Sequence, residues 1–192
     1  LLMHYYLGLD ISTSCTGWSQ ITLDDSQRVL DVKLGYILLS KLKDSFSKAQ
    51  CVYEELEKIK KDFSPTQIFI EENLQAFRPG ASSAKTLVKL ARFNGVVSYI
   101  SQNIFDVDPE FVNVNHARKV LEIKIQREKV CGISTKQQVL DWVSERQDLK
   151  DYSWPTKILK SGPRKGKSII DPVCYDMADA YVIGLAGSMI QN

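Results

Sequence analysis

The chain has 192 residues, of which 44% are hydrophobic, and carries 25 Lys and Arg against 23 Asp and Glu, for a formal net charge of +2. A chain of this length buries roughly 70% of its unfolded surface, so we expect one domain with a substantial core, spanning residues 3–192. A net charge this small does not by itself indicate a polyanionic partner, which must be argued from where the basic residues lie.

Cysteine spacing and apolar runs argue against a secreted or membrane protein. The four cysteines are widely spaced with no CxxC pair, and no secretory leader or membrane-length apolar run is evident. His4 and His116 do not lie in a zinc-like cluster. We therefore expect an intracellular, cytoplasmic protein with reduced cysteines, without a zinc site and without a membrane partner.

The first 72 residues predict four strands and one helix. An antiparallel meander of three strands is expected at residues 5–10, 17–23 and 29–39. Val52, Leu56 and Ile59 recur at helical spacing and predict a helix over residues 47–62. A fourth strand, residues 67–72, follows Pro65.

The rest of the chain predicts mainly helices. A long helix is expected from Ser82 or Ser83 to about Asn103, with an apolar seam from Leu90 to Ile104 that packs on the sheet or on a second subunit. The later elements are a fifth strand at 111–114, helices at 116–123 and 135–145, a mobile basic loop at 155–168, and a helix from Asp171-Pro172 to Met189. This order predicts an α/β fold with a five-stranded mixed sheet, three antiparallel strands followed by two parallel ones, and helices on both faces, as in the ribonuclease H-like architecture. Actin-like ATPases and sugar kinases begin with a similar arrangement.

Acidic residues stand where they can converge. Asp10 ends one apolar strand and Glu71 another, whereas Asp176 and Asp179 are three apart on a helix and share a face. Such a cluster suits divalent cations, which relieve its repulsion. Taken singly, Asp10 is equally a turn residue, and an isolated helical pair is more often favourable charge in the first turns of a helix; the combination of three acidic motifs favours a metal site. Strand alternation allows only one of Glu71 and Glu72 to face Asp10.

Three segments together resemble the RuvC family of Holliday junction resolvases, most nearly its divergent phage-type members. They are Gly8-Leu9-Asp10-Ile11-Ser12-Thr13-Ser14-Cys15-Thr16-Gly17-Trp18, Ile70-Glu71-Glu72-Asn73 and Asp176-Met177-Ala178-Asp179-Ala180. The resemblance implies that Asp10, Glu71, Asp176 and Asp179 bind two Mg²⁺ or Mn²⁺ ions per active site, and it selects Glu71 over Glu72. It also implies a homodimer, an active-site lysine at Lys136, and host-cell cytoplasm if the protein is phage-encoded. Bacterial members commonly have histidine where Asp176 stands.

Basic residues suggest where DNA would bind. Lys85, Lys89 and Arg92 form one stripe of the long helix, which is equally the solvated face of an amphipathic helix. Arg78 and Phe77 lie in the loop before that helix, and Phe77 either packs locally or stacks on an unpaired base. A second group in the Gly- and Pro-containing loop favours DNA contact and comprises Lys157, Lys160, Arg164, Lys165 and Lys167.

The sequence therefore predicts a metal-dependent, structure-selective endonuclease that resolves four-way DNA junctions by paired phosphodiester hydrolysis. One alternative is a ribonuclease H-like nuclease that acts on other branched DNA or on RNA–DNA hybrids. A second is an actin-like ATP-binding phosphotransferase, although the short chain shows no second Gly-rich phosphate segment. A third is a junction-binding scaffold without catalytic activity.

Overall fold

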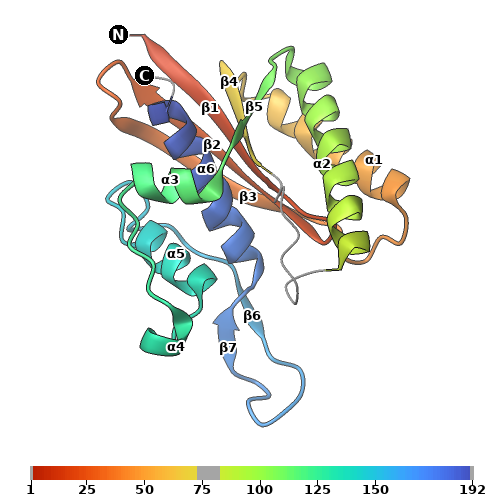
Figure 1. Cartoon of the computed structure of the whole chain (residues 1–192), viewed down its shortest axis with the longest axis vertical. Coiled ribbons are helices and arrows are strands. Elements are labelled where there is room, and N and C mark those ends of the chain that lie inside the picture. Colours follow the sequence, from red (N-terminus) through yellow and green to blue (C-terminus); the bar gives the residue numbers. More distant parts are fainter. Residues whose placement is uncertain (1, 73–82, 191–192) are drawn as a thin grey trace.

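The computed structural model describes residues 2–72 and 83–190, and its centre is a five-stranded mixed sheet of order β3-β2-β1-β4-β5 (Figure 1). The strands are β1 (Met3–Ile11), β2 (Cys15–Asp24), β3 (Val29–Leu38), β4 (Gln67–Glu71) and β5 (Pro109–Val112). β1 pairs with β2 and β2 with β3 in antiparallel register, whereas β4 runs parallel to both β1 and β5. The predicted mixed sheet of the ribonuclease H-like fold is therefore confirmed.

Helices cover both faces of the sheet, as expected (Figure 1). α1 (Ser45–Lys60) and α2 (Ala84–Phe105) pack on one face, over Leu7 and Leu9 of β1. The helices on the other face are α3 (Val114–Val120), α5 (Thr135–Ser144) and α6 (Val173–Ile190). Because side chains alternate along a strand, β1 supplies apolar residues to both cores. The apolar seam of α2 packs on the sheet, where Phe93, Val97 and Ile104 are buried.

Two glycines allow α6 to lie unusually close to the sheet. A Cβ added to Gly17 of β2 would come within 2.0 Å of the Asp176 carbonyl oxygen, and one added to Gly8 of β1 would come within 2.3 Å of the Ala180 carbonyl oxygen. Any larger side chain at either position would push α6 outward. The glycines thus set the distance between the first turns of α6 and the end of β1.

α6 is also the one described helix that is long and apolar enough to cross a membrane. Its 18 residues have a mean hydropathy of 1.2, and 72% of them are buried inside the fold. Its apolar character is explained by its position, since it lies between the sheet and the α3 and α5 helices.

Several boundaries differ from the sequence expectation. β5 ends at Val112 rather than Val114, because the Asn113 side chain accepts hydrogen bonds from the Asn115 and His116 amides and so begins α3 earlier. A short helix not expected from the sequence, α4 (Glu128–Cys131), precedes α5.

The expected loop at 155–168 is instead largely a hairpin. β6 (Thr156–Ile158) pairs with β7 (Ser168–Ile170), and only the segment between them forms a loop. Gly162 and Gly166 lie within that segment with positive φ angles of 79° and 85°, which only glycine adopts readily. Glycine and proline therefore mark the tip of a hairpin here rather than a loop without regular structure.

Candidate active site

The acidic residues singled out in the sequence lie together in one pocket. Asp10 near the end of β1, Glu71 at the end of β4, and Asp176 and Asp179 in the first turns of α6 all line a cavity of about 620 Å³. β1 and β4 are adjacent and parallel, and Leu9 pairs with Ile70, so the next residues along each strand reach the same edge of the sheet. The close approach of α6 adds the other two carboxyl groups.

Burial and mutual repulsion raise the pKa values of these acids. The Asp10 pKa is raised well above its usual value, first by burial and then by the charges of Glu71, Asp179 and Asp176. Burial, followed by the charge of Glu71, raises the Asp179 pKa to about 7. Side-chain contact between Asp10 and Glu71 further raises the Asp10 pKa and opposes the rise that burial causes in the Glu71 pKa, the pattern expected when one proton relieves the repulsion between two acids.

Two cationic side chains border the acids. Lys136, in the first turn of α5, lines the pocket, and its charge lowers the pKa values of Glu71, Asp176 and Asp179. Arg118 of α3 also lines the pocket, with its Nη2 atom 3.9 Å from Asp179 Oδ1. Lys136 was expected from the resemblance, whereas Arg118 was missed. An arginine in a seven-residue helix gives no signal in the sequence, because only the packing of α3 on α6 brings it to the acids.

Polar side chains from outside the acidic group hold its parts in place. Asn94, buried in α2, donates from Nδ2 to the Glu71 carbonyl oxygen at 3.3 Å. The buried Cys15 side chain interacts with the Asp176 carboxylate, and this interaction lowers the Asp176 pKa against the larger effect of burial. Neither residue was predicted, since an Asn in a helix and a lone Cys are common core residues.

Known proteins were compared with this chain by sequence and by structure. No family model matches the sequence, and no curated protein matches it. Among solved structures, Thermus thermophilus RuvC in complex with a Holliday junction substrate has a TM-score of 0.62 at 13% identity, covering 97% of this chain and 94% of that chain. The chain has the RuvC-like fold.

Two further solved structures share this fold. A second Thermus thermophilus RuvC structure matches with a TM-score of 0.59 at 14% identity, covering 97% of this chain and 95% of that chain. The yeast mitochondrial Holliday junction resolvase Ydc2 matches with a TM-score of 0.50 at 14% identity, covering 95% of this chain and 77% of that chain. In all three cases the similarity extends over nearly the whole chain and is not limited to a local motif.

The residues of the acidic pocket fit hard divalent cations. All four acids offer oxygen ligands, the kind that Mg²⁺ and Mn²⁺ prefer. The Asp179 Oδ1 atom is buried without a hydrogen-bond partner, a condition that a cation would relieve. Within residues 2–72 and 83–190, no three His, Cys, Asp or Glu side chains already form a complete metal-binding group. Ion binding would therefore require the carboxylates to draw closer together.

Glu72 lies at the same pocket as Glu71 but has a different partner. It also lines the pocket, and Asn113 Nδ2 donates to its Oε2 atom at 3.4 Å. Glu71 is the glutamate whose pKa is affected by Asp10, and its selection over Glu72 stays a prediction. The roles of the acids and of Lys136 in catalysis remain predictions.

The predicted DNA-binding residues form two exposed basic surfaces. We call Lys85, Lys89 and Arg92 the α2 stripe; these residues border a largely apolar cavity of about 610 Å³ between α1 and α2. We call the second surface the hairpin tip; it comprises the exposed residues Lys157, Lys160, Arg164, Lys165 and Lys167 on and between β6 and β7. Arg78 and Phe77 lie outside the described residues.

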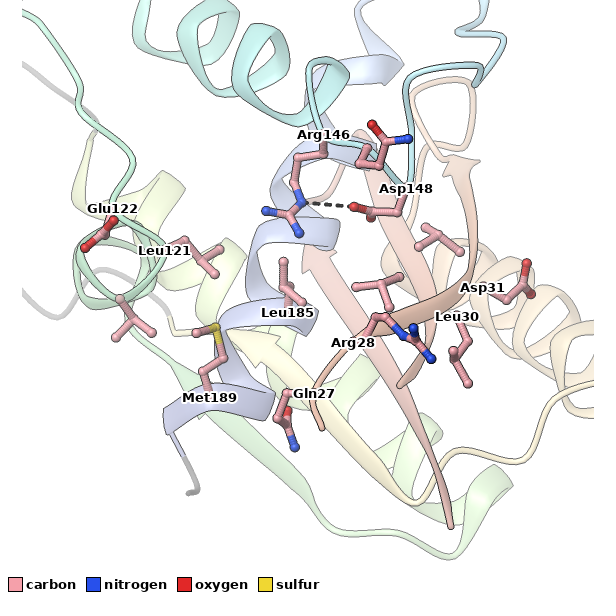
Figure 2. A pocket seen from close by; sticks show the side chains of 14 residues that line it. Gln27, Arg28, Leu30, Asp31, Leu121, Glu122, Arg146, Asp148, Leu185 and Met189 are labelled. Carbon is pink, nitrogen blue, oxygen red and sulfur yellow. Dashed lines mark hydrogen bonds and ion pairs between the residues drawn. The ribbon is translucent and has the colours of Figure 1, made fainter. Parts of the chain in front are cut away.

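A larger cavity, of about 860 Å³, lies at the other end of the sheet strands, between the start of β3, the end of α3 and the end of α6 (Figure 2). Both arginines that line it are paired with a carboxylate: Arg146 Nε donates to Asp148 at 3.2 Å, and Arg28 pairs with Asp24 at 3.1 Å. Its remaining acids, Asp31 and Glu122, come from β3 and the segment after α3, and they are fewer than the acids that line the acidic pocket. We therefore place the chemistry in the acidic pocket.

Proposed function

We propose that this protein is a divalent-metal-dependent endonuclease that resolves four-way DNA junctions. The observation that carries the proposal is the convergence of Asp10, Glu71, Asp176 and Asp179 in one pocket of a RuvC-like fold. One neighbour with this fold is described in complex with a Holliday junction substrate, which supports branched DNA as the substrate. The fold alone is shared by proteins of many activities, so the acidic pocket is the more specific argument.

The pocket residues would divide the work between holding cations and balancing charge. Asp10, Glu71, Asp176 and Asp179 would hold two Mg²⁺ or Mn²⁺ ions, which supply an activated water and neutralise charge on the leaving oxygen. Lys136, on the α5 side, would offset the charge of the scissile phosphate. The buried position of the acids keeps their carboxylates poorly solvated and available to cations.

Two basic surfaces near the pocket are candidates for DNA contact. The hairpin tip immediately precedes α6, which carries Asp176 and Asp179, and the α2 stripe is near the pocket because Leu90 of α2 lines it. Both surfaces are exposed and can contact phosphates without losing internal ion pairs that the structure shows. We propose that one DNA arm follows the hairpin tip. Because the α2 stripe lines the same cavity as the apolar residues Phe46, Val88 and Val96, DNA and a second subunit would compete for that face of α2.

Paired cuts on opposed strands require two active sites, and we propose that a homodimer supplies them. An exposed apolar surface on α1 and α2 is available for this contact, and we call it the α2 apolar face: it comprises Phe46, Val88, Val96 and Tyr99, which are 88%, 49%, 44% and 69% exposed. An apolar surface rimmed by charged residues is typical of a protein interface. A two-fold contact of α2 with its copy would use the same face twice.

Cleavage of labelled DNA tests the proposal. We expect the wild-type protein to cut a four-way junction in Mg²⁺ and to leave a linear duplex of the same sequence intact. The Asp10→Asn variant should bind the junction but not cut it, since it loses an ion ligand while keeping its shape. Asp62→Asn changes an exposed carboxylate outside the pocket in the same way and should cut normally.

The same assay separates the alternatives. Equal cutting by wild type and Asp10→Asn, or no cutting by either, would contradict the proposal. Preferential cutting of an RNA–DNA hybrid would keep the acidic pocket but change the substrate. Magnesium-dependent ATP binding without cleavage of any nucleic acid would favour a phosphotransferase instead.

A further inference from the structure

Arg118 is placed against the acidic pocket in an unusual way. Its side chain is only 20% exposed, and its Nη2 atom is 3.9 Å from the Oδ1 atom of Asp179, whose side chain is 13% exposed. That separation allows electrostatic attraction but is too long for a hydrogen bond. The arginine therefore lies beside the acid without binding it directly.

Both partners have unsatisfied polar atoms at this contact. The Arg118 Nε atom and the Asp179 Oδ1 atom are buried, and neither has a hydrogen-bond partner among the described residues. Leaving a buried polar atom unpaired costs roughly 1–3 kcal/mol. Both residues line the acidic pocket, so ligands that enter it could satisfy them: a cation at the carboxylate and an anion at the guanidinium.

We propose that Arg118 is the internal counterion of the acidic pocket and that, once Asp179 holds a divalent cation, Arg118 turns to bind a phosphate of the DNA backbone. This inference rests on the proposed nuclease function and extends it to a residue that the sequence did not indicate. A cation at Asp179 repels the guanidinium, and Arg118 lines the same pocket that a bound DNA strand would enter. There a DNA phosphate offers the oxygen pair that the planar guanidinium binds through two parallel N–H donors.

The position of Arg118 complements that of Lys136. Arg118 comes from α3 and Lys136 from α5, and both line the pocket that the four acids line. Two cations held by different helices can contact one phosphate from two directions. Lysine is a single charge on a flexible stem, whereas arginine also fixes the orientation of the phosphate.

Two substitutions at Arg118 and one beside it test the inference. Arg118→Met removes the charge but keeps the length, Arg118→Lys keeps the charge but removes the paired donors, and Lys119→Met removes an exposed charge from the next residue of α3. The first measurement is Mn²⁺ affinity by calorimetry, with Mn²⁺ as the only ligand. We expect Arg118→Met to bind Mn²⁺ about threefold or more tightly because a competing positive charge is gone, and we expect Arg118→Lys and Lys119→Met to stay near wild type.

The second measurement is the cleavage rate of the junction at saturating metal, accompanied by melting temperatures. Arg118→Met should cut roughly 100-fold more slowly, the usual effect of removing one donor that stabilises developing charge, and Arg118→Lys should recover part of this loss. Tighter metal binding combined with slower cleavage is the signature expected. A purely structural arginine would instead weaken both metal binding and thermal stability.

Three outcomes overturn the inference. They are weaker Mn²⁺ binding in Arg118→Met, unchanged Mn²⁺ binding in that variant, and cleavage by Arg118→Met at the wild-type rate. Failure of the nuclease proposal is distinguishable, since wild-type protein would then cut none of the branched substrates. The Mn²⁺ measurement would still decide whether Arg118 acts as a counterion.

Discussion

At the scale of single residues, the acidic pocket lowers the stability of the folded protein in its charged form, while the same charges are what would bind cations. Asp10 and Asp179 are buried, and their pKa values are raised by burial and by the neighbouring acids. A domain folded for stability alone would replace such groups with apolar residues. Their retention in the core makes sense when a cation takes up their charge.

The first prediction concerns pH and metal. Between the ordinary Asp value of 3.8 and the folded value of about 7 for Asp179, the folded state binds more protons than the unfolded chain. The free energy of unfolding attributable to this group therefore falls as pH rises through that window. Mg²⁺ should restore stability above pH 7 by about 2.7 kcal/mol at a concentration 100 times its dissociation constant, or roughly 5–10 °C in melting temperature.

Melting curves recorded from pH 4 to pH 8, with Mg²⁺ and with EDTA, check this expectation. The gap between the two curves should widen as pH rises. Asp10→Asn should melt higher than wild type in EDTA at pH 8 and should gain less from Mg²⁺, since it lacks one of the repelling charges. A constant gap across the pH range would show that the acids are not the metal site.

The residues of the pocket differ in how visible they are in the sequence. Asp10 and Glu71 end apolar strands, and Asp176 and Asp179 share a helix face, so position along an element indicates them. Arg118 could not be found in this way, because its place depends on how α3 packs on α6. Local sequence pattern therefore predicts the acidic residues on the strands and on α6, whereas residues that reach the pocket only through helix packing can be identified only from the structure.

At the scale of elements, the approach of α6 to the sheet determines whether the pocket forms. We predict that Gly17→Ala will lower the melting temperature and weaken Mn²⁺ binding, because the added methyl group would overlap the Asp176 carbonyl oxygen. The displacement of α6 would move Asp176 and Asp179 away from Asp10. The expected loss of stability is about 1–3 kcal/mol, as for other overpacked cores.

Gly95 provides a matched control for this substitution. It lies in α2, and a Cβ added there would meet nothing within 4 Å. Gly95→Ala should raise stability slightly, by up to about 1 kcal/mol, since alanine favours a helix. If Gly17→Ala bound Mn²⁺ like wild type, the position of α6 would not control the metal site.

The hairpin tip is the second element with a measurable role. We predict that Arg164→Gln combined with Lys165→Gln weakens junction binding in Ca²⁺, where cleavage is suppressed. The slope of log affinity against log salt should fall in magnitude by about 1.8, the value expected for two lost phosphate contacts. Lys33→Gln with Lys61→Gln removes two exposed charges elsewhere and should leave the slope unchanged. Equal slopes for both double variants would remove the hairpin tip from the DNA interface.

The elements also show where sequence patterns fail. The ends of β1 to β4 and of α2 were predicted to within two residues, because longer patterned segments and a Ser83 cap specify them, whereas the short β5 is shifted by two residues from its expected position. The hairpin was predicted as a loop because its strands have only three residues each, too few to show alternation. Its pairing comes from two segments ten residues apart that meet only in the folded chain.

At the scale of the whole molecule, the two faces of the sheet carry different features. The face covered by α3, α5 and α6 contributes Arg118, Lys136, Asp176 and Asp179 to the pocket. The face covered by α1 and α2 carries the α2 stripe and the α2 apolar face. The pocket lies where Asp10 and Glu71 end the strands between these two layers, so a partner on α2 could approach without covering the acids.

The last prediction tests that partner as a second copy of the chain. Val96→Glu with Tyr99→Glu would place two carboxylates in the α2 apolar face, and two copies meeting there would bring four like charges together. We expect wild type to sediment as a dimer and the double variant as a monomer with an unchanged melting transition of the domain. On a four-way junction the monomer should make single nicks in place of paired cuts, because only one pocket is present per bound protein.

Val130→Glu is the control: it changes a residue of α4 that is 77% exposed and should leave the dimer intact. A double variant that still sediments as a dimer would move the interface away from α2, and a wild-type monomer that makes paired cuts would show that one pocket acts twice.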